Sequence, residues 1–281
     1  MGGKLIISDM FVLTGKIIVI TGGAGLLGQQ YAEAIAEYKG IPVILDLSDD
    51  KIQTVVSRIK EQYRVEAVGM IADITSEEQI SQSCQKILKD FGKVDVLINN
   101  AARNPKVEEN DNRTNFSRLE DFDLELWNQD LAVGLTGSFL CAKHFGHAIA
   151  RNPKGGVIIN ISSDLGVIAP DQRLYYKEGV PEKLQCVKPI TYSIVKSGLI
   201  GLTRYLATYW ADKNVRCNAV CPGGVFDGQD EAFVQKVNQL IPLGRMASKD
   251  EYKGVIVFLA SDASLYMNGA IVSIDGGRSV W

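Results

Sequence analysis

Tyr192 and Lys196 lie four residues apart in a stretch whose apolar spacing predicts a helix. Residues at this spacing project from one helix face, so both side chains should reach the same cavity. A nearby ammonium favours phenolate over phenol, which makes tyrosine a proton acceptor suited to an alcohol–ketone couple. On its own the pair fits two surface side chains better. It follows the predicted strand 155–163, however, and Ser163 at the end of that strand could hold the substrate oxygen.

A glycine-rich turn opens the first predicted helix. Its sequence is TGGAGLLG, residues 21–28. Glycines there let the backbone approach a pyrophosphate, and the N–H groups of the helix start receive its charge. A purely structural turn is the alternative. Asp46 ends the second predicted strand, where a carboxylate can bind both adenosine ribose hydroxyls and repel a 2′-phosphate. This predicts NAD over NADP, and it is compatible with a helix start capped by Ser48.

Strands and helices alternate along the chain and must position these groups. Apolar, β-branched runs without polar alternation predict parallel strands at 16–22, 41–47, 65–73, 94–102, 155–163, 214–223 and 270–277. Amphipathic stretches predict helices at 29–39, 51–63, 77–90, 124–150, 193–211, 230–240 and 249–260. We therefore predict a single α/β domain over 1–281, with a Rossmann-like, doubly wound parallel sheet and helices on both faces.

The ends of the third and fourth predicted strands extend the proposed cofactor cleft. Asp73 and Ile74 end the third strand, where an adenine edge would lie. The sequence NNAA, residues 99–102, ends the fourth strand near the expected ribose. The irregular stretches 103–118 and 164–190 are of a length suited to active-site loops rather than to separate domains.

Composition excludes several classes of partner. The chain has 281 residues and a formal net charge of -3, with no Lys/Arg run to attract nucleic acid or anionic lipid. It shows neither a leader peptide nor an apolar run near the ~20 residues that span a bilayer, so we expect a cytoplasmic protein. Its five cysteines are odd in number and never spaced as C-x-x-C, which indicates reduced thiols, with Cys217 and Cys221 as the one pair that could face each other.

Other chemistry-bearing residues are expected to be structural. His144 and His147 stand at i and i+3 on a predicted helix, but no carboxylate or other third ligand is placed to complete a metal site, so no metal is predicted. The carboxylates of DLELWNQD, residues 123–130, are expected to be solvated helix charge. Helices 124–150 and 193–211 carry apolar residues on more than one face, which is consistent with packing against sister subunits.

Taken together, these motifs resemble the classical branch of the short-chain dehydrogenase/reductase superfamily over about residues 15–277. The resemblance rests on the glycine turn, NNAA, NISS, YSIVK, VRCNAVCPGGV, PLGRM and FLASDASLYMNGAIVSIDGG. It implies that Ser163 orients the substrate oxygen, that Tyr192 is the general acid/base, and that Lys196 binds the nicotinamide ribose and lowers the tyrosine pKa. It also implies a homotetramer or homodimer. The predicted NAD contacts are Gly22, Gly25, Leu26, Leu27, Asp46, Asp73, Ile74, Asn100, Tyr192, Lys196, Gly223 and Val225.

Four departures from the family pattern stand out. Leu26 replaces the middle glycine of the turn, as in the extended branch, and Asp227 stands near the position of a threonine that contacts the carboxamide. Gly134 replaces an asparagine that anchors a relay water, so either another group holds that water or the relay is altered. Asn128, six positions earlier, is not expected on the same face. Ser163 and Tyr192 are 29 positions apart, where about a dozen is usual.

The extra residues between the serine and the tyrosine should project over the substrate mouth. Residues 171–190 carry Arg173, Lys177, Lys183, Lys188, Tyr175 and Tyr176. Such residues could stack on a sugar ring and bind a phosphate. A solvated loop or subunit contact is the alternative. The run from YYKEG to CPGGV resembles dehydrogenases of flagellin modification and nonulosonic-acid pathways, which implies a sugar phosphate or nucleotide-linked sugar as substrate.

The sequence therefore predicts an NAD-dependent oxidoreductase that interconverts a secondary alcohol and a ketone. The glycine spacing keeps open a sugar epimerase or dehydratase that retains its cofactor. Gly134 keeps open a protein that senses NAD without catalysis.

Overall fold

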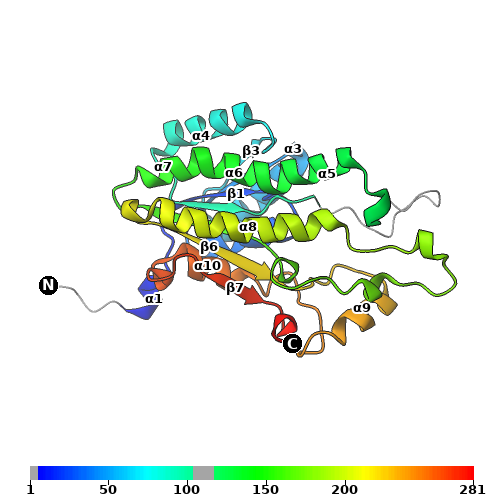
Figure 1. Ribbon diagram of the computed structural model, residues 1–281. Coiled ribbons are helices and arrows are strands. Elements are labelled where there is room, and N and C mark those ends of the chain that lie inside the picture. Colours follow the sequence, from blue (N-terminus) through cyan, green and yellow to red (C-terminus); the bar gives the residue numbers. More distant parts are fainter. Residues whose placement is uncertain (1–5, 104–116) are drawn as a thin grey trace.

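A computed structural model describes residues 6–103 and 117–281 (Figure 1). Within these ranges, seven parallel strands form one sheet in the order β3-β2-β1-β4-β5-β6-β7. The strands are β1 Ile17–Thr21, β2 Ile41–Asp46, β3 Val68–Ile71, β4 Val96–Asn99, β5 Gly156–Ile161, β6 Val215–Pro222 and β7 Ile271–Ile274. The predicted doubly wound sheet is confirmed. Of the predicted irregular stretch 103–118, residues 104–116 lie outside the described ranges.

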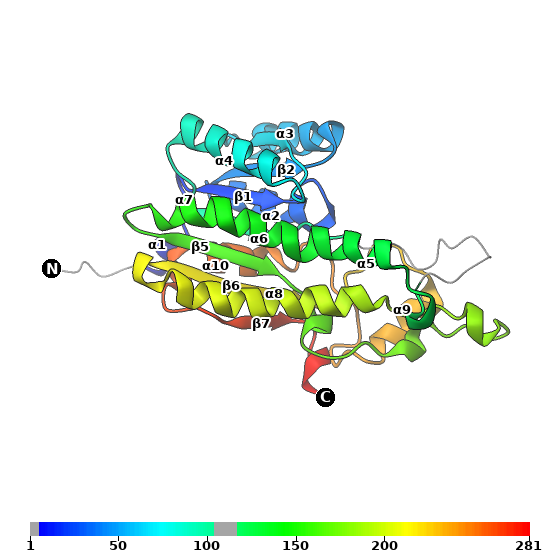
Figure 2. The same ribbon diagram turned by 45° about the horizontal axis from the view of Figure 1, so that its top comes forward.

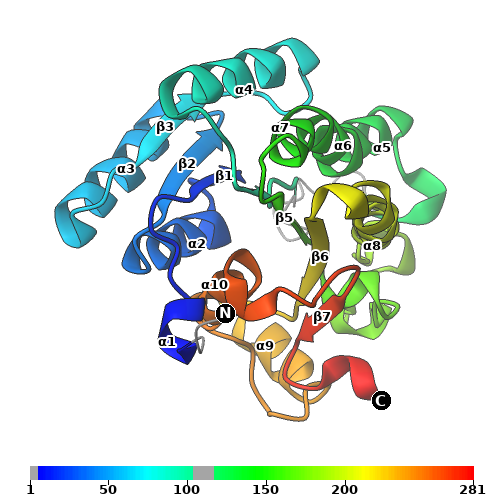
Figure 3. The same ribbon diagram turned by 90° about the vertical axis from the view of Figure 1, so that its left-hand side faces the viewer.

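Helices cover both faces of the sheet, as a view along the strands shows (Figure 3). Helices α2, α3 and α10 pack on one face, while α4, α5 to α7 and α8 pack on the other. The helices are α1 Ile7–Met10, α2 Leu26–Glu37, α3 Asp49–Tyr63, α4 Glu77–Phe91, α5 Leu124–Leu131, α6 Gly137–Cys141, α7 His147–Ala150, α8 Ile190–Tyr209, α9 Glu231–Asn238 and α10 Lys253–Ala260.

Strand β1 shows why the strand sequences lack polar alternation. Successive side chains point to opposite faces of a strand. Ile18 and Ile20 join the apolar cluster under α2, α3 and α10, whereas Ile17 and Val19 join the cluster on the other face. Every residue of the strand is buried. A sheet covered on both faces thus requires apolar residues at every position.

The predicted helix over 124–150 is continuous but locally widened. Two π-helical turns, Ala132–Thr136 and Ala142–Gly146, join α5, α6 and α7. The first turn contains Gly134 and runs alongside α8 (Figure 2). Helix α8 begins at Ile190, directly after Pro189 and three residues before the predicted start. Thr191 and Tyr192 therefore both lie in its first turn.

The remaining sequence expectations concern thiols, metals and membranes. All five cysteines are free, and Cys217 and Cys221 are buried. His144 does meet a carboxylate, contrary to expectation, because Glu77 of α4 lies 3.2 Å from its Nε2 atom. Within the described ranges, no three His, Cys, Asp or Glu residues are grouped to share a metal ion. No helix there is long and apolar enough to cross a membrane.

A buried row of polar side chains ties the centre of the sheet to α8. Asn99 of β4 stands opposite Asn160 of β5 and donates from Nδ2 to its Oδ1 atom at 2.8 Å. Asn160 in turn donates to the Thr203 hydroxyl at 2.8 Å. Thr203 donates to the Leu199 carbonyl within α8. This chain of hydrogen bonds fixes the position of α8 relative to the ends of β4 and β5.

Replacing Asn160 with alanine should destabilise the fold. Asn160 is fully buried, so its loss removes its hydrogen bonds with Asn99, Thr203 and the Cys217 sulfur and leaves buried partners without them. We expect the free energy of unfolding in urea to fall by about 2–3 kcal/mol. The exposed Gln82→Ala on α4 is the control and should cost less than about 0.5 kcal/mol. Equal losses for the two variants would contradict the role of this row.

Candidate active site

The carboxyl ends of the strands open into a cleft of about 1170 Å³. This edge is where doubly wound sheets bind their ligands. Every residue predicted from the sequence to contact the cofactor lines this cleft, namely Gly22, Gly25, Leu26, Leu27, Asp46, Asp73, Ile74, Asn100, Tyr192, Lys196, Gly223 and Val225. The fold thus gathers the whole predicted set, and its role in binding a dinucleotide stays a prediction.

The glycine turn packs too closely for side chains at two positions. A Cβ atom at Gly28 would lie 2.2 Å from the Gly22 carbonyl oxygen, and one at Gly22 would lie 2.9 Å from the Ala101 Cα atom. Gly22 also has a positive φ of 60°. Leu26 is tolerated because it begins helix α2 and needs no left-handed backbone. Gly25, Leu26 and Leu27 at this helix start line the cleft, and a helix N-terminus suits the pyrophosphate of a dinucleotide.

Asp46 ends β2 at the opposite end of the cleft from Tyr192. Its Oδ2 atom accepts a hydrogen bond from the Ala24 N–H at 3.0 Å, which links it to the glycine turn. Its Oδ1 atom accepts from the Leu47 N–H at 2.8 Å. Ser48 occupies the N-cap of α3 but makes no side-chain capping bond. The half-exposed carboxylate keeps lone pairs available to ligand hydroxyls.

Asp73, Ile74 and Asn100 form the middle of the cleft. Asp73 accepts hydrogen bonds from the Thr75 hydroxyl at 2.7 Å and the Thr75 N–H at 2.9 Å, so its carboxylate holds the turn after β3. Ile74 is buried and provides an apolar wall. Asn100 donates from Nδ2 to the carbonyl oxygens of Thr21 and Gly22, both at 3.0 Å. Asn100 thereby braces the glycine turn against the end of β4.

The loop after β6 completes the cleft. A Cβ atom at Gly223 would lie 2.7 Å from the Asp275 Cα atom, so only glycine fits there. Val225 pairs with Ala247 in an isolated β-bridge. Asp227 also lines the cleft. Backbone contacts therefore hold Gly223 and Val225 in place, and Asp227 follows them along the cleft.

Ser163, Tyr192 and Lys196 meet at one end of the cleft. Ser163 lies just beyond β5, and its side chain shares a hydrogen bond with Tyr192 in the first turn of α8. The Lys196 Nζ atom donates to the Ile161 carbonyl oxygen at 2.9 Å and lies 5.8 Å from the centroid of the Tyr192 ring. The long insertion leaves after the serine and returns before the tyrosine, so it does not separate them.

Two lysines flank the tyrosine. The Lys188 Nζ atom, from the insertion, lies 3.7 Å from the Tyr192 ring centroid. Burial lowers the pKa of Lys188 to about 8. Burial, together with the Lys188 charge, also lowers the pKa of Lys196 to about 8. Burial raises the pKa of Tyr192, and the hydrogen bond with Ser163 opposes this rise. Lysines with a pKa near neutrality can exchange protons at physiological pH.

A buried ion pair beneath Ser163 was missed by sequence reasoning. The Ser163 hydroxyl donates to Asp164 Oδ1 at 2.7 Å, and Arg278 Nη1 lies 3.3 Å from Asp164 Oδ2. Both charged side chains are buried. The only signal was position, because Asp164 directly follows NISS and Arg278 directly follows the closing DGG motif. The pair fixes the serine against the end of the chain.

Asp130 contradicts the expectation that the carboxylates of residues 123–130 are solvated. Asp123 and Glu125 are exposed, but Asp130 is only 7% exposed. Its Oδ2 atom accepts from the Thr191 hydroxyl at 2.6 Å, and its Oδ1 atom lies 3.8 Å from Arg103 Nη1. Asp130 stands four positions before Gly134, on the helix face that meets α8. That spacing was the signal that could have identified it.

Gly134 leaves no room for a side chain. A Cβ atom there would lie 2.3 Å from the Val195 Cγ1 atom. Asn128 is exposed, whereas Gly134 is buried. The place of the expected amide is thus filled by Val195, while the Asp130 carboxylate lies one helical turn earlier.

Only some of the insertion side chains that were expected to contact the substrate line the cleft. Leu174 packs against Val237, Ile241 and Met246 beside α9, and Tyr175 lies 5.7 Å from the Phe233 ring. Arg173 instead binds Asp171, at 2.9 Å and 2.7 Å. Of the four cations considered for a phosphate, Lys188 alone lines the cleft formed by the described residues.

Comparison with protein families shows the family to which this chain belongs. A family model described as short chain dehydrogenase matches residues 16–177. The chain belongs to the short-chain dehydrogenase family. A second model, described as enoyl-(acyl carrier protein) reductase, matches residues 183–279. The protein is therefore an oxidoreductase of this family, in its classical branch, which acts on CH–OH groups with a nicotinamide dinucleotide.

Several known proteins are similar along their whole length. An uncharacterized oxidoreductase of Thermotoga maritima is 33% identical over 94% of this chain and 98% of its own. An NADP-dependent mannitol dehydrogenase of Alternaria alternata is 31% identical over 98% and 96%. A post-translational flagellin modification protein of Campylobacter coli is 25% identical over 95% and 99%. The flagellin-related protein is one relative among many, so the narrower resemblance does not single it out.

Similar solved structures share this fold, but some contain NAD and others contain NADP. An NAD+-bound xylitol dehydrogenase aligns with a TM-score of 0.79 at 26% identity, over 94% of this chain and 99% of that one. A gluconate 5-dehydrogenase from Burkholderia cenocepacia, in complex with NADP and tartrate, aligns with a TM-score of 0.83 at 25% identity, over 97% and 98%. These relatives use either NAD or NADP.

Replacing Lys188 with methionine should raise the pKa of Lys196. The Lys188 ammonium disfavours a second positive charge nearby, so its removal favours protonated Lys196. NMR titration of protein labelled at the lysine ε-carbon should show the Lys196 midpoint move from about 8 to higher pH. The signal is assigned by its loss in Lys196→Met. The exposed Lys183→Met should leave the midpoint unchanged, and an unmoved midpoint in Lys188→Met would refute the coupling.

Proposed function

We propose that this protein is an NAD-dependent dehydrogenase that interconverts a secondary alcohol and a ketone on a polyhydroxylated, sugar-like substrate. The observation that carries the proposal is the meeting of Ser163, Tyr192 and Lys196 at one end of a cleft whose other end carries Asp46. One end offers acid/base groups and the other offers a ribose-binding carboxylate. The close-packed glycine turn between them fits a dinucleotide.

The side chains divide the chemistry between them. The bound nicotinamide supplies the hydride acceptor for oxidation and the hydride donor for reduction. Tyr192 takes the proton of the substrate hydroxyl as the ketone forms, and returns it in the reverse direction. Ser163 holds the same substrate oxygen from the β5 side. Lys196, fixed to the Ile161 carbonyl, stabilises the phenolate by its charge and binds the nicotinamide ribose.

Asp46 supports NAD as the cofactor. A carboxylate at the end of β2 can accept hydrogen bonds from both adenosine ribose hydroxyls but repels a 2′-phosphate. The cationic residues among the described lining of the cleft are Arg103, Lys188, Lys196 and Arg278, and all of them follow β4 in the chain. The described lining around Asp46 therefore carries no positive charge to receive a 2′-phosphate.

Polyol-related neighbours and the insertion together support a sugar-like substrate. The mannitol, xylitol and gluconate dehydrogenases are named for polyhydroxylated substrates. In this chain, Tyr175 and Lys188 line the cleft from the insertion. An aromatic face and an ammonium suit a sugar ring and an acidic group. We therefore extend the proposal to a sugar phosphate or a nucleotide-linked sugar.

Assembly and compartment belong to the same proposal. Phe139 of α6 and Ile194, Tyr205 and Tyr209 of α8 are large apolar or aromatic side chains that are at least 42% exposed. Such residues on neighbouring helices support a homodimer or homotetramer. One sheet built from both halves of the chain supports a single domain. Free cysteines suit the reducing cytoplasm.

Replacing Tyr192 with phenylalanine tests the mechanism. The variant keeps the ring but loses the acid/base oxygen, so kcat for polyol or sugar oxidation should fall by about 10²–10⁴. The Kd for NAD, measured by calorimetry, should stay within a few-fold of the wild-type value. Tyr176→Phe on the exposed part of the insertion is the matched control and should keep full activity. Unchanged turnover in Tyr192→Phe, or no stoichiometric NADH from the wild type, would reject the proposed dehydrogenase.

Replacing Asp46 with serine tests the cofactor. Removing the carboxylate removes its repulsion of a 2′-phosphate and one partner of the ribose hydroxyls. The ratio of kcat/KM for NAD to that for NADP should fall by at least about tenfold, or about 1.4 kcal/mol. Asp49→Ser, in the first turn of α3, is the control. A wild-type enzyme that prefers NADP would disprove the assignment.

A further inference from the structure

We propose that Asp130 is a second proton acceptor, which receives from Tyr192 the proton that the tyrosine takes from the substrate, and that a single water in a small cavity between α5 and α8 carries it. The inference rests on the proposed function, because it concerns the proton released when the alcohol is oxidised. It assigns the end of the proton path to the Asp130 carboxylate rather than to the asparagine amide expected at position 134.

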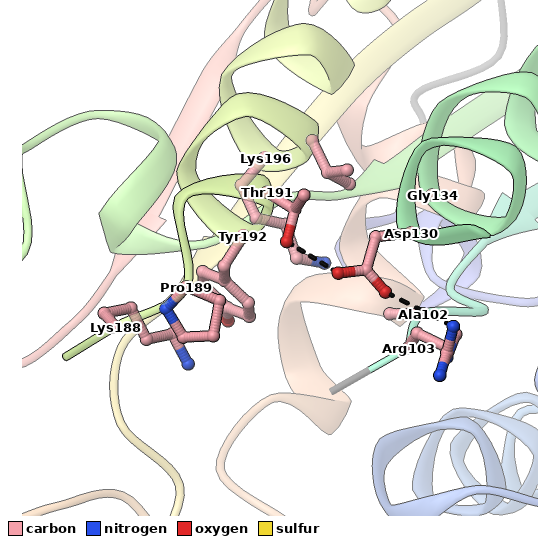
Figure 4. A pocket seen from close by; sticks show the side chains of 10 residues that line it. Ala102, Arg103, Asp130, Gly134, Lys188, Pro189, Thr191, Tyr192 and Lys196 are labelled. Atoms are coloured by element: carbon pink, nitrogen blue, oxygen red, sulfur yellow. Dashed lines mark hydrogen bonds and ion pairs between the residues drawn. The ribbon is translucent and has the colours of Figure 1, made fainter. Parts of the chain in front are cut away.

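The cavity has room for one water molecule. Its volume is about 20 Å³, and a buried water needs about 10–15 Å³. Asp130 and Gly134 line it from one helix, and Thr191, Tyr192 and Lys196 line it from the other. Figure 4 shows the Asp130 carboxylate between Thr191 and Arg103, joined to each by a dashed line. One water can therefore touch both Asp130 and the end of the cavity formed by Tyr192 and Lys196.

Asp130 has one oxygen that needs a hydrogen-bond donor. The Oδ2 atom is satisfied by the Thr191 hydroxyl at 2.6 Å. The Oδ1 atom is buried and has no hydrogen-bond partner among the described residues, since Arg103 Nη1 at 3.8 Å is too far. A buried carboxylate oxygen without a donor is costly. A water in the cavity supplies that donor.

Three cationic side chains line the cavity together with Asp130. Lys188 precedes α8, Lys196 lies within it, and Arg103 follows β4, and all three line the cavity. The phenol of Tyr192 is the remaining titratable group in its described lining. Each cation is also a donor that can orient the water.

The transfer balances without any further reactant. Tyr192 takes the substrate hydroxyl proton during oxidation. The new phenol O–H bond then breaks and its proton joins the water, while one O–H bond of the water breaks and a bond forms to Asp130 Oδ1. The proton leaves Asp130 for solvent beside Arg103, whose side chain is 40% exposed. The site is returned with Tyr192 as phenolate and Asp130 ionised.

The substitution Asp130→Asn separates a proton acceptor from a mere anchor for water. Asparagine has the same shape and can still bind Thr191 and the water, but it cannot take the proton. We expect kcat for alcohol oxidation to fall by about tenfold or more. KM, the Kd for NAD and the melting temperature should stay near wild-type values. The difference in kcat between Asp130→Asn and the wild type should become smaller as the concentration of buffer base rises, because the buffer can accept the proton instead.

The matched control is Glu125→Gln. It removes the same charge from the same helix at an exposed position, and it should leave kcat and the pH profile of kcat unchanged. Turnover of Asp130→Asn equal to that of the wild type across the pH range would overturn the proposal. A loss of activity explained by weaker NAD binding or a lower melting temperature would also overturn it.

Chemical rescue gives a second, independent measurement. Asp130→Ala enlarges the cavity, so added acetate should restore part of the lost kcat while acetamide of the same shape should not. Equal rescue by both, or by neither, would contradict proton transfer to a carboxylate. The proposed function fails separately, because wild-type enzyme that produces no NADH from any polyol or sugar would refute it before Asp130 is tested.

Discussion

The hydrogen bond from Lys196 to the Ile161 carbonyl is the contact on which the site depends. It joins Lys196, the seventh residue of α8, to Ile161, the last residue of β5. A second hydrogen bond joins the same two segments, because the Ser162 hydroxyl, just after β5, donates to the Lys196 carbonyl oxygen at 2.7 Å. Helix and strand are thus held to each other by both ends of one residue. Ser163 and Tyr192 meet because of this link, and the chain between them is free to vary in length.

The fold could be predicted from the sequence because the physics that specifies it is local. A strand buried on both faces must be apolar at each position, as Ile17 to Ile20 are. A close-packed turn must have glycine, as at Gly28. The cofactor cleft could be predicted for the same reason, since parallel strands bring the residues that follow them to one edge.

Asp130 was missed because its burial depends on a contact with Thr191, 61 positions later, and its spacing from Gly134 was the one sign of it in the sequence. Its neighbours Asp123 and Glu125 are solvated, and the polarity of the stretch alone does not indicate which carboxylate turns inward. Asp164 and Arg278 were missed for the same reason, since their partnership joins the end of β5 to the end of the chain. Sequence patterns indicate which face of an element is buried, whereas charge pairing across the fold depends on tertiary distance.

The contact between Gly134 and Val195 has a consequence for how this family can change. An asparagine cannot enter position 134 while Val195 keeps its methyl groups, because the Cβ atom alone would lie 2.3 Å from one of them. Shrinking Val195 first would open a void beside Lys196 before any amide arrived to fill it. The two arrangements are therefore separated by a less stable intermediate, and a lineage that has adopted one is held there by the order in which substitutions must occur.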